Sequence, residues 1–212
     1  FAALASQTYN VFEVVVVDRY YEDAEFEALV GDLKGLENLV RVKLDEGLGF
    51  DEVFEAALDQ AKGSYCALLD PDVVLAPEAL FEVVRRINET HVYPDQPQAQ
   101  IIYAHHDTIG ADARLSNLAC KPIYSPDLLL SYNYIGPFVV FERDLVQRVH
   151  EEQGFVSEAL LYDLILKAFE ITGHLERIDQ ILYHIQSDRT ANPSSEQARI
   201  TAREEDFRGG RR

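Results

Sequence analysis

Continuous apolar runs that end at a polar residue alternate with segments of helical periodicity over the first 90 residues. In residues 12–18, four consecutive valines follow Glu13 and end at Asp18. A run this apolar predicts a strand buried on both faces, which is typical of a parallel sheet. Residues 50–62 carry apolar side chains at i, i+3 and i+4 spacing and stop before Gly63, which predicts a helix.

The remaining pattern extends this alternation to residue 185. Further strands are predicted at 39–44, 65–69, 100–104, 138–141 and 181–185, and further helices at 24–33, 78–88, 144–152 and 158–169, with 1–7 as the end of a helix and 121–130 irregular. Strands and helices that alternate with short links predict βαβ units with right-handed crossovers. We therefore expect an α/β fold, a three-layer sandwich around a mostly parallel sheet.

The strand predicted at 65–69 runs into Asp70-Pro71-Asp72. Because side chains alternate along a strand, the two carboxylates are expected to point the same way. Such a pair at the carboxyl end of a buried strand can hold a divalent cation, which in turn can bind a diphosphate. The alternative is that Asp70 caps a turn while Asp72 is solvated, which is the commoner role of an isolated acidic pair.

Composition narrows the classes of partner. The formal net charge of -18 argues against a nucleic-acid-binding surface, and it means that an anionic substrate needs a metal or a local basic cluster. The sequence shows neither a secretory signal nor an apolar run long enough for a membrane span. We expect a cytoplasmic location, with peripheral attachment at the inner membrane face through partners as an option. Since the chain lacks Met and begins inside a predicted helix, we expect an excised domain or an incomplete N-terminus.

Eight short motifs follow one another along residues 5–186. They are Ala5-Ser6-Gln7-Thr8-Tyr9 leading into 12–18, Ala61-Lys62-Gly63-Ser64-Tyr65 leading into 69–72, Pro77-Glu78-Ala79-Leu80, residues 103–107, residues 121–130, Asn133-Tyr134-Ile135-Gly136, Tyr162-Asp163-Leu164 and Leu182-Tyr183-His184. In this order they resemble the family-2 glycosyltransferases, which adopt the GT-A fold. The block from 121 to 136 is especially similar to bacterial surface-polysaccharide transferases.

The resemblance implies an activity and a division of the chain. Such enzymes move a sugar from a nucleotide-diphosphate donor (a UDP-, GDP- or dTDP-sugar) to a hydroxyl of a glycan or other acceptor, with inversion. Mg²⁺ or Mn²⁺ neutralises the leaving diphosphate, and a carboxylate takes the acceptor proton. Residues 1–186 would form the GT-A-like domain, with a nucleotide-binding half at 1–90 and an acceptor-side half at 100–186. Residues 187–212 would be a polar tail or linker.

The resemblance also assigns site residues. Asp70 and Asp72 match the metal motif, with Asp72 as the expected direct ligand and Asp70 also on the donor. Asp18 matches the carboxylate that contacts the nucleotide base or ribose, although a turn-forming role is the alternative. His184 matches a position that approaches the metal and the diphosphate. Asp107 matches a carboxylate near the donor sugar or the acceptor.

Three departures from the family pattern leave a second hypothesis open. The family's opening strand is absent, and Phe54 and Glu55 stand where an Arg-Asn pair faces the nucleotide. Leu161 stands at the usual place of the general base, which leaves Asp163 and Glu158 as substitutes. The second hypothesis is a catalytically degenerate GT-A-like module that binds a nucleotide, a glycan or a partner protein.

One position near the predicted site stays ambiguous. The family usually has an acid where His105 stands. This histidine is either a ligand of metal or phosphate, or an exposed residue at the end of a strand.

Overall fold

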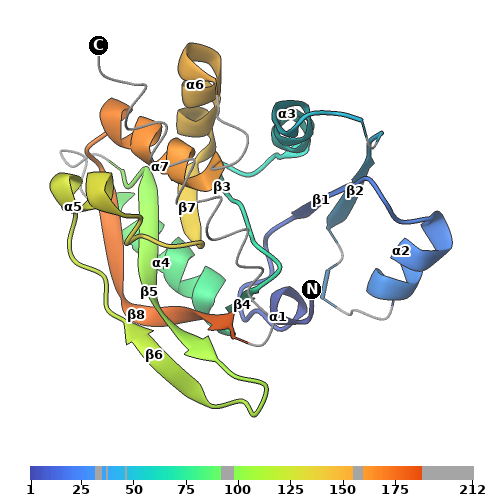
Figure 1. Cartoon of the computed structure of the whole chain (residues 1–212), viewed down its shortest axis with the longest axis horizontal. Coiled ribbons are helices and arrows are strands. Elements are labelled where there is room, and N and C mark those ends of the chain that lie inside the picture. Colours follow the sequence, from blue (N-terminus) through green and yellow to red (C-terminus); the bar gives the residue numbers. More distant parts are fainter. Residues whose placement is uncertain (32–34, 37, 46, 92–97, 155–159, 188–212) are drawn as a thin grey trace.

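The fold is a mixed α/β arrangement of two sheets and their covering helices (Figure 1). The computed structural model describes residues 1–31, 35–36, 38–45, 47–91, 98–154 and 160–187. The elements are α1 (Ala2–Ala5), β1 (Val14–Asp18), α2 (Asp23–Val30), β2 (Leu39–Lys43), α3 (Phe50–Gln60), β3 (Tyr65–Ala67), β4 (Val73–Leu75), α4 (Ala79–His91), β5 (Ile101–Ile109), β6 (Leu115–Ala119), α5 (Pro126–Ser131), β7 (Val139–Glu142), α6 (Arg143–Gln153), α7 (Leu160–Ile171) and β8 (Leu175–Gln186).

The larger sheet is built around the long strand β5. Its strand order is β3-β7-β5-β8-β4, and β6 pairs with β5 as well. β7 and β6 share one edge of β5, β7 along Ile101–Tyr103 and β6 along His106–Ile109, while β8 follows the other edge. β1 and β2 form a separate parallel pair.

The α/β class is confirmed, but the sheets are mixed rather than mostly parallel. Among the described residues, β1–β2 and β5–β8 pair in parallel, and the other four ladders are antiparallel. Among these antiparallel pairs only β5 and β6 follow each other in the chain, whereas β7 and β8 return from further along it to pair with β3, β5 and β4, and local sequence patterns do not fix the direction of such pairs. Antiparallel strands can be joined by a tight turn, as β5 and β6 are, whereas parallel strands need a long crossover.

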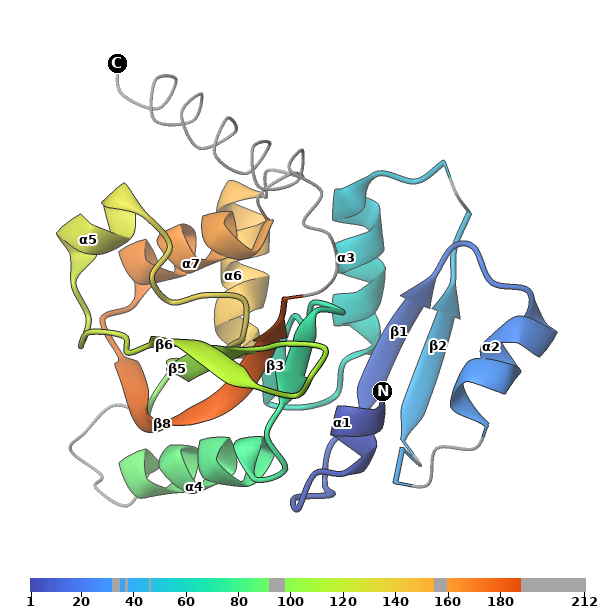
Figure 2. The ribbon, with the colours of Figure 1, turned by 60° about the horizontal axis from the view of Figure 1, so that its bottom comes forward.

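Helices cover both faces of the larger sheet (Figure 2). One core cluster packs α3, α5, α6 and α7 against one face, with Ile101, Phe141 and Leu164 nearly inaccessible. The other packs α4 on the opposite face, around Ala79, Ile102 and Leu182. This two-sided burial explains the continuous apolar runs of β5 and β7.

The first sheet is less completely buried than its sequence predicts. The four valines of β1 are only half-buried, and β1 pairs with β2 along one edge. Its start is tied to the start of β3, because the Glu13 carboxylate accepts hydrogen bonds from the backbone N–H groups of Lys62 and Gly63 at 2.5 and 3.0 Å. Among the described residues no strand joins β1 to β3.

Element boundaries differ from the sequence prediction mainly in the second half. The strands predicted at 100–104 and 181–185 are parts of the longer β5 and β8. β4, β6 and the short helix α5 were not predicted, and residues 126–131 are helical rather than irregular. β4 has only three residues. β6 is mostly exposed and includes Asn117 at φ 51°, so it lacks the apolar alternation that marks a strand.

Candidate functional site

A hydrogen-bonded aspartate and histidine lie on two neighbouring strands of the larger sheet. Asp107 of β5 and His184 of β8 stand directly opposite each other, and His184 Nδ1 is bonded to Asp107 Oδ1. Asp107 is 4% exposed, while His184 is more open. A carboxylate at Nδ1 fixes the ring orientation, so that Nε2 is the nitrogen that an incoming ligand would meet. The structure thus brings together two residues that the sequence named separately.

The turn formed by Asp70, Pro71 and Asp72 lies beside His184, on the other edge of β8. Val74 of β4 pairs with His184, and Gln186 N donates to the Asp72 carbonyl at 3.0 Å, one step further along the ladder. Since side chains two residues apart share a face, Asp72 lies diagonally across from His184, at a Cα spacing of about 7–8 Å. Asp107, His184 and Asp72 therefore line one face across three adjacent segments.

Asp70 shapes this turn. Its Oδ1 accepts the backbone N–H of Asp72 at 2.9 Å, and its carbonyl accepts that of Val73 at 3.0 Å. This is the turn-capping role considered as the alternative for Asp70. A donor-binding role for Asp70 and a ligand role for Asp72 stay predictions.

The side chains near this turn fit a cation that is held partly by the protein and partly by the phosphates of its substrate. Within the described ranges, no group of three or more His, Cys, Asp or Glu side chains is arranged to hold a metal ion by itself. Mg²⁺, however, is commonly bound by one or two carboxylates together with substrate phosphates and water. Asp70 and Asp72 would hold the ion in that mode, with His184 beside them.

Asp18 lies in the other sheet and is occupied by neighbours within its own fold. It is 4% exposed at the end of β1, and its Oδ1 accepts the backbone N–H groups of Tyr20 and Tyr21 at 3.0 Å each. Its Oδ2 accepts two hydrogen bonds from Arg41, at 2.9 and 2.6 Å, and the Arg41 guanidinium stacks 4.2 Å from the Phe26 ring centroid. Asp18 thus forms the turn after β1, while contact with a nucleotide stays a prediction.

These bonds predict how the Asp18 carboxyl titrates. The N–H of Tyr21 is the largest cause that lowers its pKa to about 2, and Arg41 adds to the shift. In R41M we expect the pKa of Asp18 to rise but to stay below 3.8, because both backbone donors remain. NMR titration of the carboxyl carbon measures this, with K43M as the control, since Lys43 pairs with Asp23 instead. An Asp18 pKa that is unchanged in R41M would contradict the predicted contribution of the guanidinium.

The positions proposed to replace the general base have different surroundings. Asp163 of α7 is buried, and its Oδ2 is 2.6 Å from Lys167 Nζ, which also donates to the Gly154 carbonyl at 2.9 Å. Leu161 packs against the core cluster of α5–α7. Glu158 lies outside the described residues. A catalytic role for Asp163 or Glu158 stays a prediction.

Two further positions named by the sequence contact neighbours within the fold. Phe54 is buried in the core and meets the His150 ring edge-on at 6.5 Å, so it packs α3 against α6. His105 is buried rather than exposed. Its Nε2 is 2.8 Å from Asp179 Oδ1, and its Nδ1 accepts the backbone N–H of Lys121 at 3.1 Å.

The sequence analysis missed a buried lysine that lies directly behind the aspartate–histidine pair. Lys121 is 3% exposed, and its Nζ donates to the Ile135 carbonyl and to the Tyr183 hydroxyl, the latter at 2.5 Å. Tyr183 precedes His184 and stacks on the His106 ring at 4.9 Å. Burial lowers the pKa of Lys121 to about 7, and burial followed by the Lys121 charge lowers the pKa of His106 to about 4. The sequence signal that could have indicated a buried lysine was the position of Lys121 between apolar residues, directly before Pro122.

Gly136 makes room for this cluster. It adopts φ +86°, and an added Cβ would lie 2.6 Å from the Tyr183 hydroxyl oxygen and 3.1 Å from Lys121 Nζ. A side chain at this position would therefore displace the lysine or the tyrosine.

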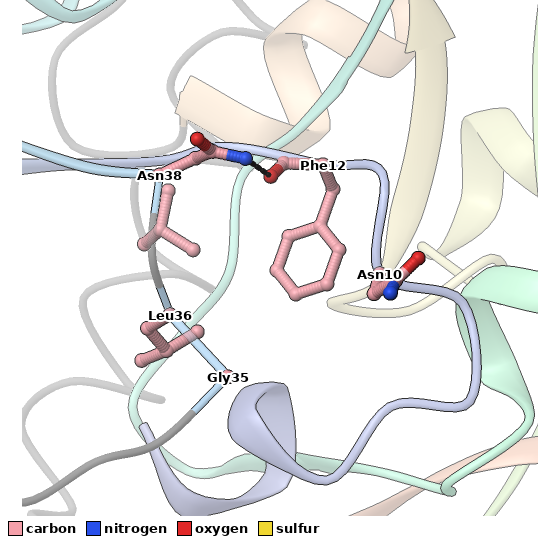
Figure 3. A pocket seen from close by; sticks show the side chains of 6 residues that line it. Asn10, Phe12, Gly35, Leu36 and Asn38 are labelled. Carbon is pink, nitrogen blue, oxygen red and sulfur yellow. Dashed lines mark hydrogen bonds between the residues drawn. The ribbon is translucent and has the colours of Figure 1, made fainter.

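A pocket lies at the amino end of β1, and Asp107, His184 and Asp72 are not among the residues that line it (Figure 3). It is lined by Asn10, Phe12, Val14, Gly35, Leu36 and Asn38, and the Asn38 amide donates to the Phe12 carbonyl at 3.3 Å. These residues surround the amino ends of β1 and β2. Ligands of parallel α/β sheets bind outside the carboxyl ends of the strands, so this pocket is not the donor site that the sequence predicts.

In the part of the chain that the structure describes, no helix combines the length and the apolar character that crossing a bilayer requires.

Solved structures with a similar fold indicate the class of protein. The structure of residues 1–349 of TarS from S. aureus superposes with a TM-score of 0.63 at 19% identity, covering 98% of this chain and 60% of that one. The same TarS fragment in complex with UDP-GlcNAc gives a TM-score of 0.66 at 19% identity, covering 91% of this chain and 55% of that one. The fold is that of the GT-A glycosyltransferases.

Sequence comparison then identifies the family. The model of glycosyl transferase family 2 matches residues 1–149, and the chain belongs to that family. The uncharacterized protein y4gI of Sinorhizobium fredii is 29% identical over 95% of this chain, and the O-antigen biosynthesis protein RfbC of Myxococcus xanthus is 27% identical over 91%. The chain spans only 22% and 15% of the length of these two relatives.

Proposed function

We propose that this domain transfers a sugar, with inversion, from a nucleotide-diphosphate donor to a hydroxyl of a glycan or other acceptor. The observation that carries the proposal is the shared face of Asp107, His184 and Asp72, next to the Asp70 turn. The family, the similarity to an O-antigen biosynthesis protein and the likeness to a fold solved with UDP-GlcNAc support it. Surface polysaccharide is the corresponding acceptor class.

In this proposal each residue of the site has a separate role. Asp70 holds the turn, which presents the Asp72 carboxylate beside His184. Asp107 orients His184 toward the diphosphate through the bond to Nδ1. A bound Mg²⁺ or Mn²⁺ supplies positive charge for the leaving diphosphate. The acceptor proton passes to a carboxylate, for which Asp107, Asp163 and Glu158 are the three candidates.

The test is release of nucleoside diphosphate from UDP-, GDP- and dTDP-sugars, with and without an acceptor mixture of bacterial O-polysaccharide fragments. We expect one donor to be used in a Mn²⁺- or Mg²⁺-dependent way, and D107N to reduce the rate. D163N and E158Q, assayed in parallel, assign the proton acceptor. If a longer native form that contains this domain uses none of the donors, the proposed activity is wrong.

A degenerate binding module is the second candidate, and two observations favour it. The packing of Leu161 against the core leaves no carboxylate at the usual base position, and both oxygens of Asp18 are engaged within the fold. In this case the domain binds a nucleotide, a glycan or a partner protein without turnover.

The variant L161D separates the two candidates. If the native chain is an active enzyme, we expect L161D to show no gain in turnover and to lose about 1–3 kcal/mol of stability, because a carboxylate replaces a core-packing side chain. Donor hydrolysis that appears in L161D but is absent from the native chain would identify the native chain as disabled. L161N is the matched control, since it has a similar shape without a basic group. Turnover by nucleotide release and unfolding in urea are the two measurements.

A further inference from the structure

We propose that Tyr124 and Tyr132, together with Tyr134, form a stacking subsite for the pyranose rings of a neutral saccharide. We call these three residues the tyrosine platform. The inference rests on the proposed function, because it assigns the acceptor-binding surface of that same domain.

The two outer rings are exposed although they belong to a well-packed segment. Tyr124 is 36% and Tyr132 is 46% exposed, with Ile123 and Leu130 also open to solvent nearby in the chain. The neighbouring residues Leu129 and Ile135 are buried in the core. The segment is thus anchored in the core, and its exposed aromatic rings are held on a well-packed backbone.

Aromatic contacts hold each ring of the platform in place. Tyr124 stacks flat on Phe169 of α7, with 4.6 Å between ring centroids and 2° between ring planes. Tyr132 meets Tyr134 edge-on at 6.2 Å, and Tyr134 meets the buried Tyr103 edge-on at 6.3 Å. Rings already fixed in this way lose little conformational entropy when a ligand stacks on them.

The Tyr134 hydroxyl is fixed by a hydrogen bond from its own segment of chain. The backbone N–H of Ser125 donates to the Tyr134 hydroxyl at 2.9 Å. Burial is the main cause that raises the pKa of Tyr134, and the hydroxyls of Tyr124 and Tyr132 add to it. The platform therefore combines apolar ring faces with polar edges, as sugar rings do with their C–H faces and hydroxyl edges.

The platform is linked to the aspartate–histidine pair through a short stretch of chain. Gly136 lies four positions after Tyr132, and four steps along the chain can span at most about 14 Å. An added Cβ on Gly136 would lie 3.1 Å from Lys121 Nζ, and Lys121 binds Tyr183, the residue before His184. The platform therefore continues into the segment that supports the aspartate–histidine pair from behind.

Charge favours a neutral saccharide over other ligands of aromatic surfaces. The chain carries a net charge of -18, and the described cation nearest in sequence, Lys121, is buried. Nucleic acids and acidic glycans would be repelled by such a protein, whereas a neutral sugar pays no electrostatic cost.

The chain has no tryptophan, so Y132W introduces a single fluorescent reporter into the platform. The full chain carrying Y132W is titrated with cellohexaose, chitohexaose and mannohexaose at millimolar concentrations. We expect a saturable change in tryptophan emission with at least one of them. Adding Y124L, in which a leucine still covers Phe169, should weaken that binding about three- to tenfold, which is the effect of losing one ring contact. F81W is the matched control, because Phe81 is 48% exposed on α4, on the opposite face of the sheet.

The outcomes separate this proposal from the proposed function. No emission change with any of the three saccharides, or an equal change in F81W, overturns the platform. A change caused by phosphatidylcholine vesicles and by no saccharide overturns it too. Calorimetric binding of UDP, GDP and dTDP, each with Mn²⁺, to the same Y132W protein is recorded separately. If saccharide binds but nucleotide does not, the platform stands and the transferase activity fails.

Discussion

Replacing Asp72 with asparagine is expected to reduce metal-dependent donor turnover by about 10²–10³-fold, the size of effect seen when one electrostatic contact to developing charge is lost. Asp72 stands on the ladder beside His184, at the end of the turn that Asp70 caps. Asparagine keeps the shape and the backbone bond to Gln186 but removes the charge that would balance a divalent cation. The measurement is the initial rate of nucleoside diphosphate release at saturating Mn²⁺, with folding checked by circular dichroism.

The matched control for this substitution is D59N, which removes the same charge from an exposed position on α3. D59N should retain the wild-type rate. A D72N protein that retains full activity would show that Asp72 does not take part in donor binding, and the site built around His184 would be wrong.

The variant K121M is expected to remove a large pH dependence of stability between pH 7 and pH 9.5. Burial lowers the pKa of Lys121 from 10.5 to about 7. Between these values the unfolded chain binds a proton that the folded chain does not, so the free energy of unfolding rises with pH. Over pH 7 to 9.5 the Lys121 contribution grows by about 3 kcal/mol. Below pH 7 the amine is protonated in both states and contributes no further slope.

Urea unfolding at pH 7.0, 8.0 and 9.5 measures this difference. The window stops at 9.5 because exposed tyrosines of the unfolded chain begin to ionise near pH 10. K121M should lack this rise, and its free energy of unfolding should fall slightly toward pH 9.5, because burial raises the pKa of the Cys66 thiol to about 11 in the fold. K62M, which removes an exposed lysine, should rise with pH like the wild type. An equal rise in K121M and wild type would contradict a neutral, buried Lys121.

Local patterns predicted the elements whose burial is regular. The valine run of β1, the periodicity of α3 and the apolar end of β3 at the acidic turn all identify their elements correctly. β4 and β6 could not be predicted in this way. β4 is too short to show a period, and β6 passes a register shift opposite His106 and Thr108, which disrupts its alternation.

For the candidate site, too, the sequence predicted individual residues from local motifs but not the long-range contacts between them. The motif resemblance named Asp107 and His184 but could not predict their bond. The two residues are 77 positions apart, and their contact depends on the register of β5 and β8, whose ladder contains two register shifts. Nor could the resemblance predict that Arg41 holds Asp18, or that Lys121 is buried behind the site. Such contacts depend on tertiary packing, which a single sequence does not display.

The most direct test of the account is calorimetric titration of UDP, GDP and dTDP, each with and without Mn²⁺, into this chain and into a longer native form that contains it. The account predicts that one nucleotide binds only in the presence of Mn²⁺, and that D72N abolishes this binding. Absence of metal-dependent binding by the longer form, or binding that D72N leaves unchanged, would contradict a donor site at Asp70, Asp72 and His184.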